Sequence, residues 1–360
     1  MTINHSYYLH LAFQLAEKNL GQTGLNPSVG SIVVKNNSII SSGVTSNKGR
    51  PHSEFNALNK IKKATCLSLY TTLEPCTHYG LTPPCTNIII KKGIKNVFYA
   101  FEDPDIRTFK KAKIILSKQG VKTKFIKSEK YKKFYRSYFV NKKHNIPFIS
   151  AKIAISKDYF TINKKNKKIT NNLSIKTSHL LRFKHDAILS TSKTINADNA
   201  LLNCRINGLN NYKPDLLIID LNLKLKKKLK LNKIIKQRQT FLITNIENKH
   251  KTQSYKRKGY KIIYINSLQS KKDFNLLYKK LYKLGYSRIF VETGLVFLNT
   301  LIKNKLVNDF YIFKSNNILG KKGKNNTTVK YIKNISSKPI PINLNDDKLY
   351  KKEFWKCLMV

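Results

Sequence analysis

The sequence predicts two α/β domains joined in one chain. Its 360 residues are enough for about two domains. Short β-branched and aromatic runs alternate with segments whose apolar residues have helical spacing, which indicates sheets covered by helices. These signals restart after His144-Asn145-Ile146-Pro147, so we predict one domain at 1–145 and a second at 146–360.

The first domain is expected to begin with a helix and a β-hairpin. Apolar residues from Tyr8 to Leu15 have helical spacing, and Gly21 follows as a helix-ending residue. Two β-rich runs meet across Asn36-Asn37, which is a hairpin signal. The remaining pattern predicts strands at 29–35, 38–44, 66–73, 97–101 and 121–126, and helices at 5–20, 53–63, 85–92, 107–119 and 128–143.

The second domain repeats the alternation over a longer stretch. The Lys/Asn-rich segments 163–172 and 321–327 are expected to be mobile loops. Strands are predicted at 148–156, 187–190, 216–220, 240–244, 261–265, 288–292, 309–313 and, as a closing strand, 348–359, with helices at 173–184, 273–284 and 295–305.

The charge of the chain is strongly positive, at +50. Such a charge alone would suggest nucleic-acid binding. The lysines, however, occur along the whole chain, which favours a compositional bias over a dedicated surface. The run from Leu223 to Leu231 alternates Leu with Lys and predicts a solvated strand face or an exposed connection. We therefore expect no specific nucleic-acid partner, and a surface field that favours phosphorylated, anionic substrates.

Composition also excludes several classes of protein. No stretch approaches the roughly 18–20 apolar residues of a membrane span. The N-terminal residues have neither the charged nor the apolar region of a signal peptide, so none is expected. The five cysteines are scattered, which argues for a reducing compartment and a cytoplasmic protein rather than a disulfide scaffold.

Four residues in two short strings carry the strongest chemical signal. Pro51-His52-Ser53-Glu54 supplies one imidazole, and Cys76 and Cys85 supply two thiolates. Three such ligands leave the fourth tetrahedral position of a zinc ion for water, as catalytic zinc requires. Glu54 follows the ligand His52 by two residues and can move the proton of that water to a leaving amine. The pattern is typical of nucleoside and nucleobase deaminases.

A closed structural zinc site is the alternative reading of these residues. It needs a fourth protein ligand, and Cys66 and His78 are the nearby candidates. Neither has the close pairing that structural zinc sites usually show. The placed glutamate favours the catalytic interpretation, because a structural site has no use for an acid/base.

The first half of the chain resembles the deaminase half of the bifunctional deaminase–reductase family of riboflavin biosynthesis. The strings that carry the resemblance appear in the family's order. They are Asn26-Pro27-Ser28-Val29-Gly30, Pro51-His52-Ser53-Glu54, and 73–85, where Gly80-Leu81-Thr82-Pro83-Pro84-Cys85 is the most specific part. Cytidine and tRNA-adenosine deaminases have Cys-x-x-Cys instead of this spacing.

The second half resembles the reductase half of the same family. The matching strings are Ala187-Ile188-Leu189, then Thr194, then Ala197-Asp198-Asn199-Ala200-Leu201 with Arg205, and Phe290-Val291-Glu292-Thr293-Gly294. The likeness implies a cytidine-deaminase-like α/β/α zinc domain followed by a domain similar in fold to dihydrofolate reductase. It covers nearly the whole chain, strongly before residue 105 and more loosely after residue 145.

The resemblance also implies a reaction. The substrate would be 2,5-diamino-6-(5-phosphoribosylamino)pyrimidin-4(3H)-one, whose 2-amino group the first half hydrolyses. The second half would then reduce the ribosyl group to ribityl with NADPH, giving 5-amino-6-(5-phosphoribitylamino)uracil. Zinc and NADPH are the implied cofactors, and a homo-oligomer is expected.

The resemblance assigns roles to further residues. For the substrate it implies Asn26, His78, Leu202 and Glu292, with Arg182 and Arg205 at its phosphate, and for the cofactor Ala154, Lys168, Thr194, Asp198 and Gly294. Simpler roles stay open: an Asx turn for Asn26, a surface histidine for His78, a solvated charge for Arg182, and loop capping for Thr194 and Asp198. Glu292 ends an apolar strand, where ligands of α/β proteins usually bind.

The chain also departs from the family pattern. Leu81 stands where a basic residue that meets the substrate phosphate is usual, so that contact must come from elsewhere. In the second half, Tyr159 replaces a glycine, Lys168 a tryptophan and Leu295 a proline. Two alternatives therefore stay open, a deaminase with an inactive, degenerate reductase domain and a tRNA-editing deaminase.

Overall fold

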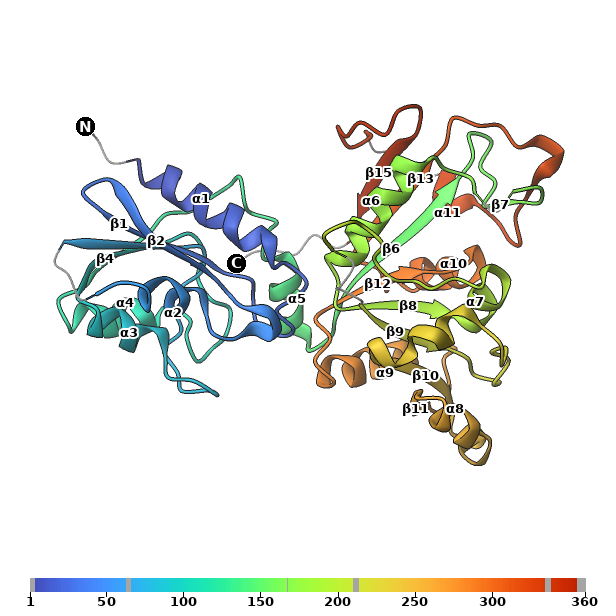
Figure 1. Ribbon diagram of the computed structural model, residues 1–360, viewed down its shortest axis with the longest axis horizontal. Helices are drawn as coiled ribbons and strands as arrows, with labels where there is room; N and C mark the ends of the chain where they lie inside the picture. Colours follow the sequence, from blue (N-terminus) through green and yellow to red (C-terminus); the bar gives the residue numbers. More distant parts are fainter. Residues whose placement is uncertain (1–3, 63–65, 167, 210–213, 334–337, 355–360) are drawn as a thin grey trace. The chain divides into compact units, whose positions relative to one another are not determined.

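A computed structural model describes residues 4–62, 66–166, 168–209, 214–333 and 338–354 (Figure 1). The chain divides into two compact units, 1–145 and 146–360, and each is an α/β structure built around its own sheet. The two-part α/β fold is thus as predicted.

Unit 1 holds a five-stranded sheet in the order β2-β1-β3-β4-β5. The hairpin β1–β2 turns at Asn36-Asn37, both at positive φ, and β3, β4 and β5 run parallel to one another. The strands are β1 Gly30–Lys35, β2 Ser38–Val44, β3 Leu67–Thr71, β4 Ile94–Tyr99 and β5 Lys122–Phe125, and the helices are α1 His5–Lys18, α2 Ser53–Leu58, α3 Cys85–Lys91, α4 Lys111–Ser117 and α5 Arg136–His144, with a 3-10 turn at Asn47–Gly49.

Two glycines let helices lie directly on opposite faces of this sheet. A Cβ on Gly30 would lie 1.9 Å from the carbonyl oxygen of Ala12 in α1. A Cβ on Gly43 would lie 2.3 Å from the carbonyl oxygen of Ser53 and 2.5 Å from the amide nitrogen of Ala57, both in α2. Helix α3 shares the α2 side of the sheet, since Ala57 and Ile89 belong to one buried cluster.

Unit 2 holds an eight-stranded sheet in the order β11-β10-β9-β8-β12-β6-β13-β15, parallel except for the edge strand β15. Its main strands are β6 Phe148–Ile155, β8 Ala187–Thr191, β9 Asp215–Ile219, β10 Thr240–Asn245, β11 Lys261–Ile265, β12 Arg288–Glu292, β13 Asp309–Lys314 and β15 Lys348–Glu353. The helices are α6 Asn172–Phe183, α7 Ser192–Asp198, α8 Gln253–Arg257, α9 Lys271–Lys283, α10 Leu295–Lys303 and α11 Lys330–Lys333, with 3-10 segments at Lys230–Gln237, Ile246–Thr252 and Gly320–Lys322.

Two sequence-based expectations about this unit need correction. The segments 163–172 and 321–327 are not simply loops, because β7 (Ile162–Asn163) pairs with β14 (Gly323–Lys324) and α6 begins at Asn172. The run from Leu223 to Leu231 is a connection, but Leu225, Leu229 and Leu231 are buried in a core cluster. Only its lysines face water, because the leucines have apolar partners that lie far away in the sequence. The end of the predicted closing strand, from residue 355, lies outside the described residues.

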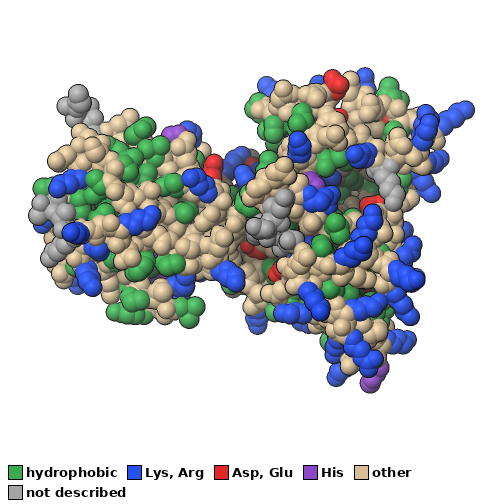
Figure 2. All heavy atoms as spheres, viewed as in Figure 1, with side chains coloured by type: hydrophobic (Ala, Val, Ile, Leu, Met, Phe, Trp, Pro, Cys, Tyr) green, Lys and Arg blue, Asp and Glu red, His purple; other side chains and the backbone are tan. Residues whose placement is uncertain are grey.

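Lys and Arg side chains lie over many elements of the face in view (Figure 2). In the part of the chain that the structure describes, every helix is too short or too polar to span a bilayer.

The close approach of α2 to the sheet predicts a marked sensitivity at Gly43. The Cβ of a Gly43→Ala variant would meet backbone atoms, which cannot rotate away as a side chain would. We expect the free energy of unfolding to fall by about 1–3 kcal/mol. The neighbouring Ser42→Ala variant is the control and should unfold like the wild type. Urea denaturation followed by circular dichroism makes the measurement, and equal midpoints for the two variants would contradict the packing described.

Candidate active sites

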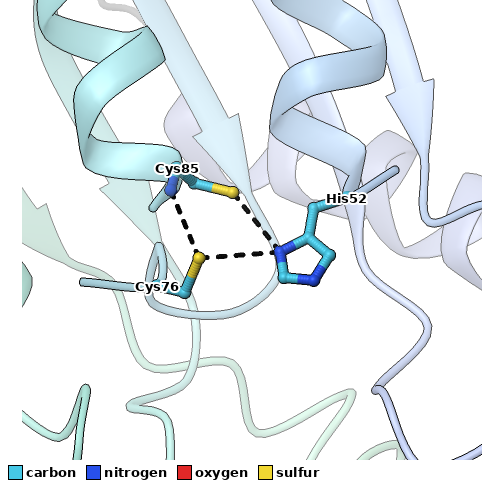
Figure 3. A group of neighbouring side chains, drawn as sticks. All are labelled: His52, Cys76 and Cys85. Atoms are coloured by element: carbon cyan, nitrogen blue, oxygen red, sulfur yellow. Dashed lines mark hydrogen bonds between the residues drawn. The ribbon is translucent and has the colours of Figure 1, made fainter. Parts of the chain in front are cut away.

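His52, Cys76 and Cys85 converge in unit 1. His52 directly precedes α2, Cys85 is the first residue of α3, and Cys76 lies in the loop after β3 (Figure 3). Their ligand atoms all lie within 4.8 Å of one another. The His52 Nδ1 atom is 3.6 Å from Cys76 Sγ and 3.4 Å from Cys85 Sγ, and Cys76 Sγ accepts the backbone N–H of Cys85 at 3.2 Å.

This arrangement fits a zinc ion. A tetrahedral zinc with ordinary ligand distances separates a nitrogen from a sulfur ligand by roughly 3.5 Å, which matches both distances from His52 Nδ1. No fourth His, Cys, Asp or Glu joins the group among the described residues. His78, one of the two candidates for a closed site, instead places Nδ1 3.1 Å from the Thr108 hydroxyl, and the other, Cys66, is exposed at the start of β3.

The thiols and the imidazole share their protons unevenly. The contact with the Cys85 thiol lowers the pKa of Cys76, and the His52 imidazole lowers it further by a smaller amount. Burial has the opposite effect but is outweighed. The pKa of Cys85 is raised by that same contact and by its burial. Burial lowers the pKa of His52, but the hydrogen bond with Cys76 and the charge of Glu54 outweigh it, so this pKa is raised. Cys76 is therefore the thiol that ionises first, and thiolates are the form that binds metal.

Glu54 is buried beside this group. It lies in the first turn of α2, and its Oε2 accepts the hydroxyl of Ser53 at 3.0 Å. Burial raises its pKa, while the His52 imidazole opposes that rise. A carboxyl group with a raised pKa exchanges protons more readily near neutral pH than an exposed glutamate does.

Two loops border the metal-binding group. Asn26 Nδ2 donates to the carbonyl oxygen of Gly49 at 3.1 Å, which places Asn26 beside the segment that leads to His52. On another side, Glu74 accepts the backbone N–H groups of Asp103, Lys110 and Ala112 at 3.1–3.2 Å. Glu74 thereby fixes the 103–110 loop and the first turn of α4, a role that sequence reasoning missed. Its position directly before Pro75-Cys76 was the available signal.

The predicted residues of unit 2 gather at the carboxyl ends of neighbouring parallel strands. Glu292 is the last residue of β12, Thr191 is the last residue of β8, and Thr194 follows in α7. The Thr194 hydroxyl accepts the backbone N–H of Gly294 at 3.0 Å and lies 3.0 Å from the Thr191 hydroxyl. Two predicted cofactor residues are therefore in direct contact at the edge where α/β sheets bind ligands.

Glu292 and Arg182 form a buried ion pair. Arg182, from α6, donates from Nε and Nη2 to the two carboxylate oxygens, and from Nη1 to the carbonyl oxygen of Asn203 at 2.9 Å. Burial favours the neutral acid, yet Arg182 and then Lys152 hold the pKa of Glu292 at about 2. The guanidinium of Arg182 is thus engaged within the protein.

The other arginine predicted for the phosphate differs from Arg182. Arg205 is exposed, with Nη1 donating to Asn203 Oδ1 at 2.8 Å. Partial desolvation of its guanidinium, and then the charge of Arg182, lower its pKa. Both arginines contact Asn203. Leu202 is buried, and its carbonyl oxygen accepts Arg238.

The other three predicted cofactor residues lie on separate segments of unit 2. Ala154 lies half-buried in β6 against the cluster of Phe313, Leu344 and Leu349. Lys168 is exposed between β7 and α6, and Asp198 is exposed at the end of α7.

Lys152 was missed by sequence reasoning. It projects from the buried strand β6, and its Nζ is 3.9 Å from Glu292 Oε2. Burial lowers its pKa, against the effect of Glu292. A single lysine in an otherwise apolar strand was a usable signal, because burying a charge is unfavourable without a partner.

Two family models match, one for each unit. Residues 2–101 match the "cytidine and deoxycytidylate deaminase zinc-binding region", and residues 147–350 match the "RibD C-terminal domain". A "riboflavin biosynthesis protein RibD" of Aquifex aeolicus is 33% identical over 319 residues, which is 87% of each chain. The chain belongs to the RibD family of riboflavin biosynthesis proteins.

Two further comparisons agree with membership of the RibD family. A "diaminohydroxyphosphoribosylamino-pyrimidine deaminase" of Buchnera aphidicola is 36% identical over 143 residues, covering 39% of this chain and 97% of its own. A solved RibD-type deaminase/reductase of Thermotoga maritima has a TM-score of 0.79 and 25% identity, with 97% of this chain and 98% of that chain covered. The chain is thus a bifunctional deaminase–reductase, with a zinc-binding deaminase domain and an NADPH-dependent reductase domain.

The position of Glu54 predicts the effect of its replacement. A Glu54→Gln variant keeps the three ligands, so its zinc content should equal that of the wild type. The amide cannot accept or deliver a proton, so deaminase kcat should fall by about 10²–10⁴-fold. Exposed Glu129 of the same unit gives the control, since Glu129→Gln should keep full activity. Zinc analysis and ammonia release measure the two quantities, and a Glu54→Gln enzyme as active as the control would exclude the assigned role.

Proposed function

We propose that unit 1 hydrolyses the 2-amino group of 2,5-diamino-6-(5-phosphoribosylamino)pyrimidin-4(3H)-one and that unit 2 reduces the ribosyl group of the product. The reduced product would be 5-amino-6-(5-phosphoribitylamino)uracil. The observation that carries the proposal is the group of three ligands, His52, Cys76 and Cys85, with the buried carboxyl of Glu54 beside it. Such a site combines an open metal position with an acid/base, as hydrolytic deamination requires.

The roles in unit 1 follow from this geometry. His52 Nδ1 and the sulfurs of Cys76 and Cys85 would hold zinc, which when bound supplies Lewis-acid activation of a water molecule near neutral pH. Glu54 takes a proton from the attacking water and passes it to the amino group. The amino group leaves as ammonia, the ring carbon keeps the oxygen as a carbonyl, and the second proton of the water ends on the adjacent ring nitrogen. Asn26 and His78 would orient the pyrimidine, Asn26 from the loop beside Gly49 and His78 from the loop after Cys76, where it contacts Thr108.

In unit 2, the proposed roles belong mainly to polar residues at or near the carboxyl ends of the strands. NADPH, when bound, supplies the hydride, and the protein chiefly supplies orientation. Thr194 and the backbone of Gly294 would hold the cofactor, with further contacts from Ala154, Lys168 and Asp198. Glu292 and Lys152 would bind the sugar hydroxyls, because their charges meet at the carboxyl end of the sheet.

The two arginines would act differently. Arg182 would hold Glu292 in place, since three of its N–H groups already have partners in the protein. Arg205, which is exposed, would bind the substrate phosphate through its planar fork, with Leu202 lining the site beside it. The geometry thus supports a refined version of the sequence-based prediction, which gave both arginines to the phosphate.

We further propose that the enzyme works in the cytoplasm as a homo-oligomer. The cysteines of the described residues, Cys66, Cys76, Cys85 and Cys204, are free thiols. A reducing compartment keeps thiols in this state and so preserves the ligands Cys76 and Cys85. Light scattering of the purified protein would give the oligomeric state.

The two arginines provide matched variants for the reductase. Arg182→Met would leave the buried Glu292 carboxylate without its partner, so the free energy of unfolding should fall by about 3–5 kcal/mol. Arg205→Met should unfold like the wild type but raise the KM for the deaminated phosphate about tenfold or more. Chemical denaturation and NADPH oxidation make the measurements. The reverse pattern would overturn the assignment, and wild-type protein that oxidises no NADPH with this intermediate would refute a working reductase.

A further inference from the structure

The side chain of Arg50 joins the two strings that carry the metal-binding residues. Arg50 stands two residues before His52, and its Nη1 donates to the hydroxyl of Thr82, which lies between Cys76 and Cys85. A Cβ added to Gly80 would lie 3.1 Å from Arg50 Nη2. The guanidinium therefore lies along the 80–82 loop, at the border of the deaminase site.

Arg50 carries a positive charge that the protein does not neutralise. Among the residues that the structure describes, no carboxylate forms an ion pair with it. The other arginine near this site, Arg107, is different, because its Nε and Nη2 donate to the two oxygens of Asp105 at 2.9 and 2.6 Å. Lys142 also pairs with Asp105, at 2.9 Å. Of these three cations, Arg50 is thus the one that no carboxylate among the described residues pairs with.

The surroundings of Arg50 are open to a ligand. Gly80 and Thr82 are exposed, and the side chain of Leu81 between them is 89% exposed. Thr82 takes one N–H of Nη1, so most of the donor fork remains for a planar or tetrahedral anion. Asn26 binds the carbonyl oxygen of Gly49, the residue before Arg50, so the pyrimidine side of the site adjoins the same segment.

We propose that Arg50 binds the phosphate of the substrate in the deaminase half. This inference rests on the proposed function, which supplies a phosphorylated substrate. In that substrate the phosphate is at the far end of the sugar from the reacting amino group. The group that binds the phosphate must therefore stand at the border of the site and not among the metal ligands. Arg50 lies at this border. Leu81, between Cys76 and Cys85, has no charge to offer the phosphate. Arg50, just before His52, would provide that positive charge instead.

The first test compares substrates with and without the phosphate. Arg50→Gln should raise the KM for the diaminopyrimidine ribosyl phosphate about ten- to a hundredfold, with kcat changed little, because charge-assisted hydrogen bonds are lost. The same variant should handle the dephosphorylated riboside like the wild type. Lys91→Gln, at the opposite end of α3 from Cys85, removes one charge elsewhere and should leave both KM values unchanged. An equal loss with both substrates, or no loss with either, would overturn the proposal.

A second test leaves Arg50 itself intact. Leu81→Glu would place a carboxylate beside the guanidinium and should raise the KM for the phosphorylated substrate about tenfold, whereas Leu81→Gln should not. In the Arg50→Gln background, Leu81→Lys should restore much of the lost affinity. Equal KM values for Leu81→Glu and Leu81→Gln would count against Arg50 as the phosphate ligand. Failure of the wild type to deaminate this substrate would instead refute the proposed function.

Discussion

The direct contact between helix α2 and strand β2 is the constraint on which the deaminase site depends. Gly43 allows this contact, because any side chain there would meet the backbone of α2. The contact sets the height of His52 and Glu54 above the sheet, since both stand at the beginning of α2. Helix α3 packs on the same side and begins with Cys85. His52 and Cys85, which are 33 residues apart in the sequence, therefore meet at one point, and neither string alone could form the site.

In the reductase unit, the order of the parallel strands brings the site residues together. Its parallel strands β8 and β12 end side by side, and Lys152 of the neighbouring strand β6 lies in register with Glu292, so their polar residues meet at one edge. Arg182, and then Lys152, compensate for the loss of water around the Glu292 carboxylate and hold its pKa well below the ordinary value. The two hydrogen bonds from Arg182 fix the orientation of this carboxylate. Fixed orientation is the main contribution that a protein makes to hydride transfer from a cofactor.

Local signals in the sequence predicted most of the fold, because hairpin turns, helix starts and apolar periodicity are determined by neighbouring residues. The two α/β units are of this kind. The convergence of His52, Cys76 and Cys85 was predicted instead from the ligand chemistry of the two strings. Pairings between distant residues could not be predicted. The short β7–β14 pairing joins segments that composition alone marks as loops. Equally, nothing near Arg182 in the sequence indicates that its guanidinium is engaged by a residue on β12.

The central claim is that one chain performs two consecutive reactions, and identification of the products by mass spectrometry tests it most directly. The purified protein would be incubated with the diaminopyrimidine ribosyl phosphate in water labelled with oxygen-18, with and without NADPH. Without NADPH, we expect a deaminated product that contains one labelled oxygen and an intact ribosyl group. With NADPH, that product should be converted to the ribityl compound. Unchanged substrate in both reactions, or a ribosyl product that persists with saturating NADPH, would contradict the account.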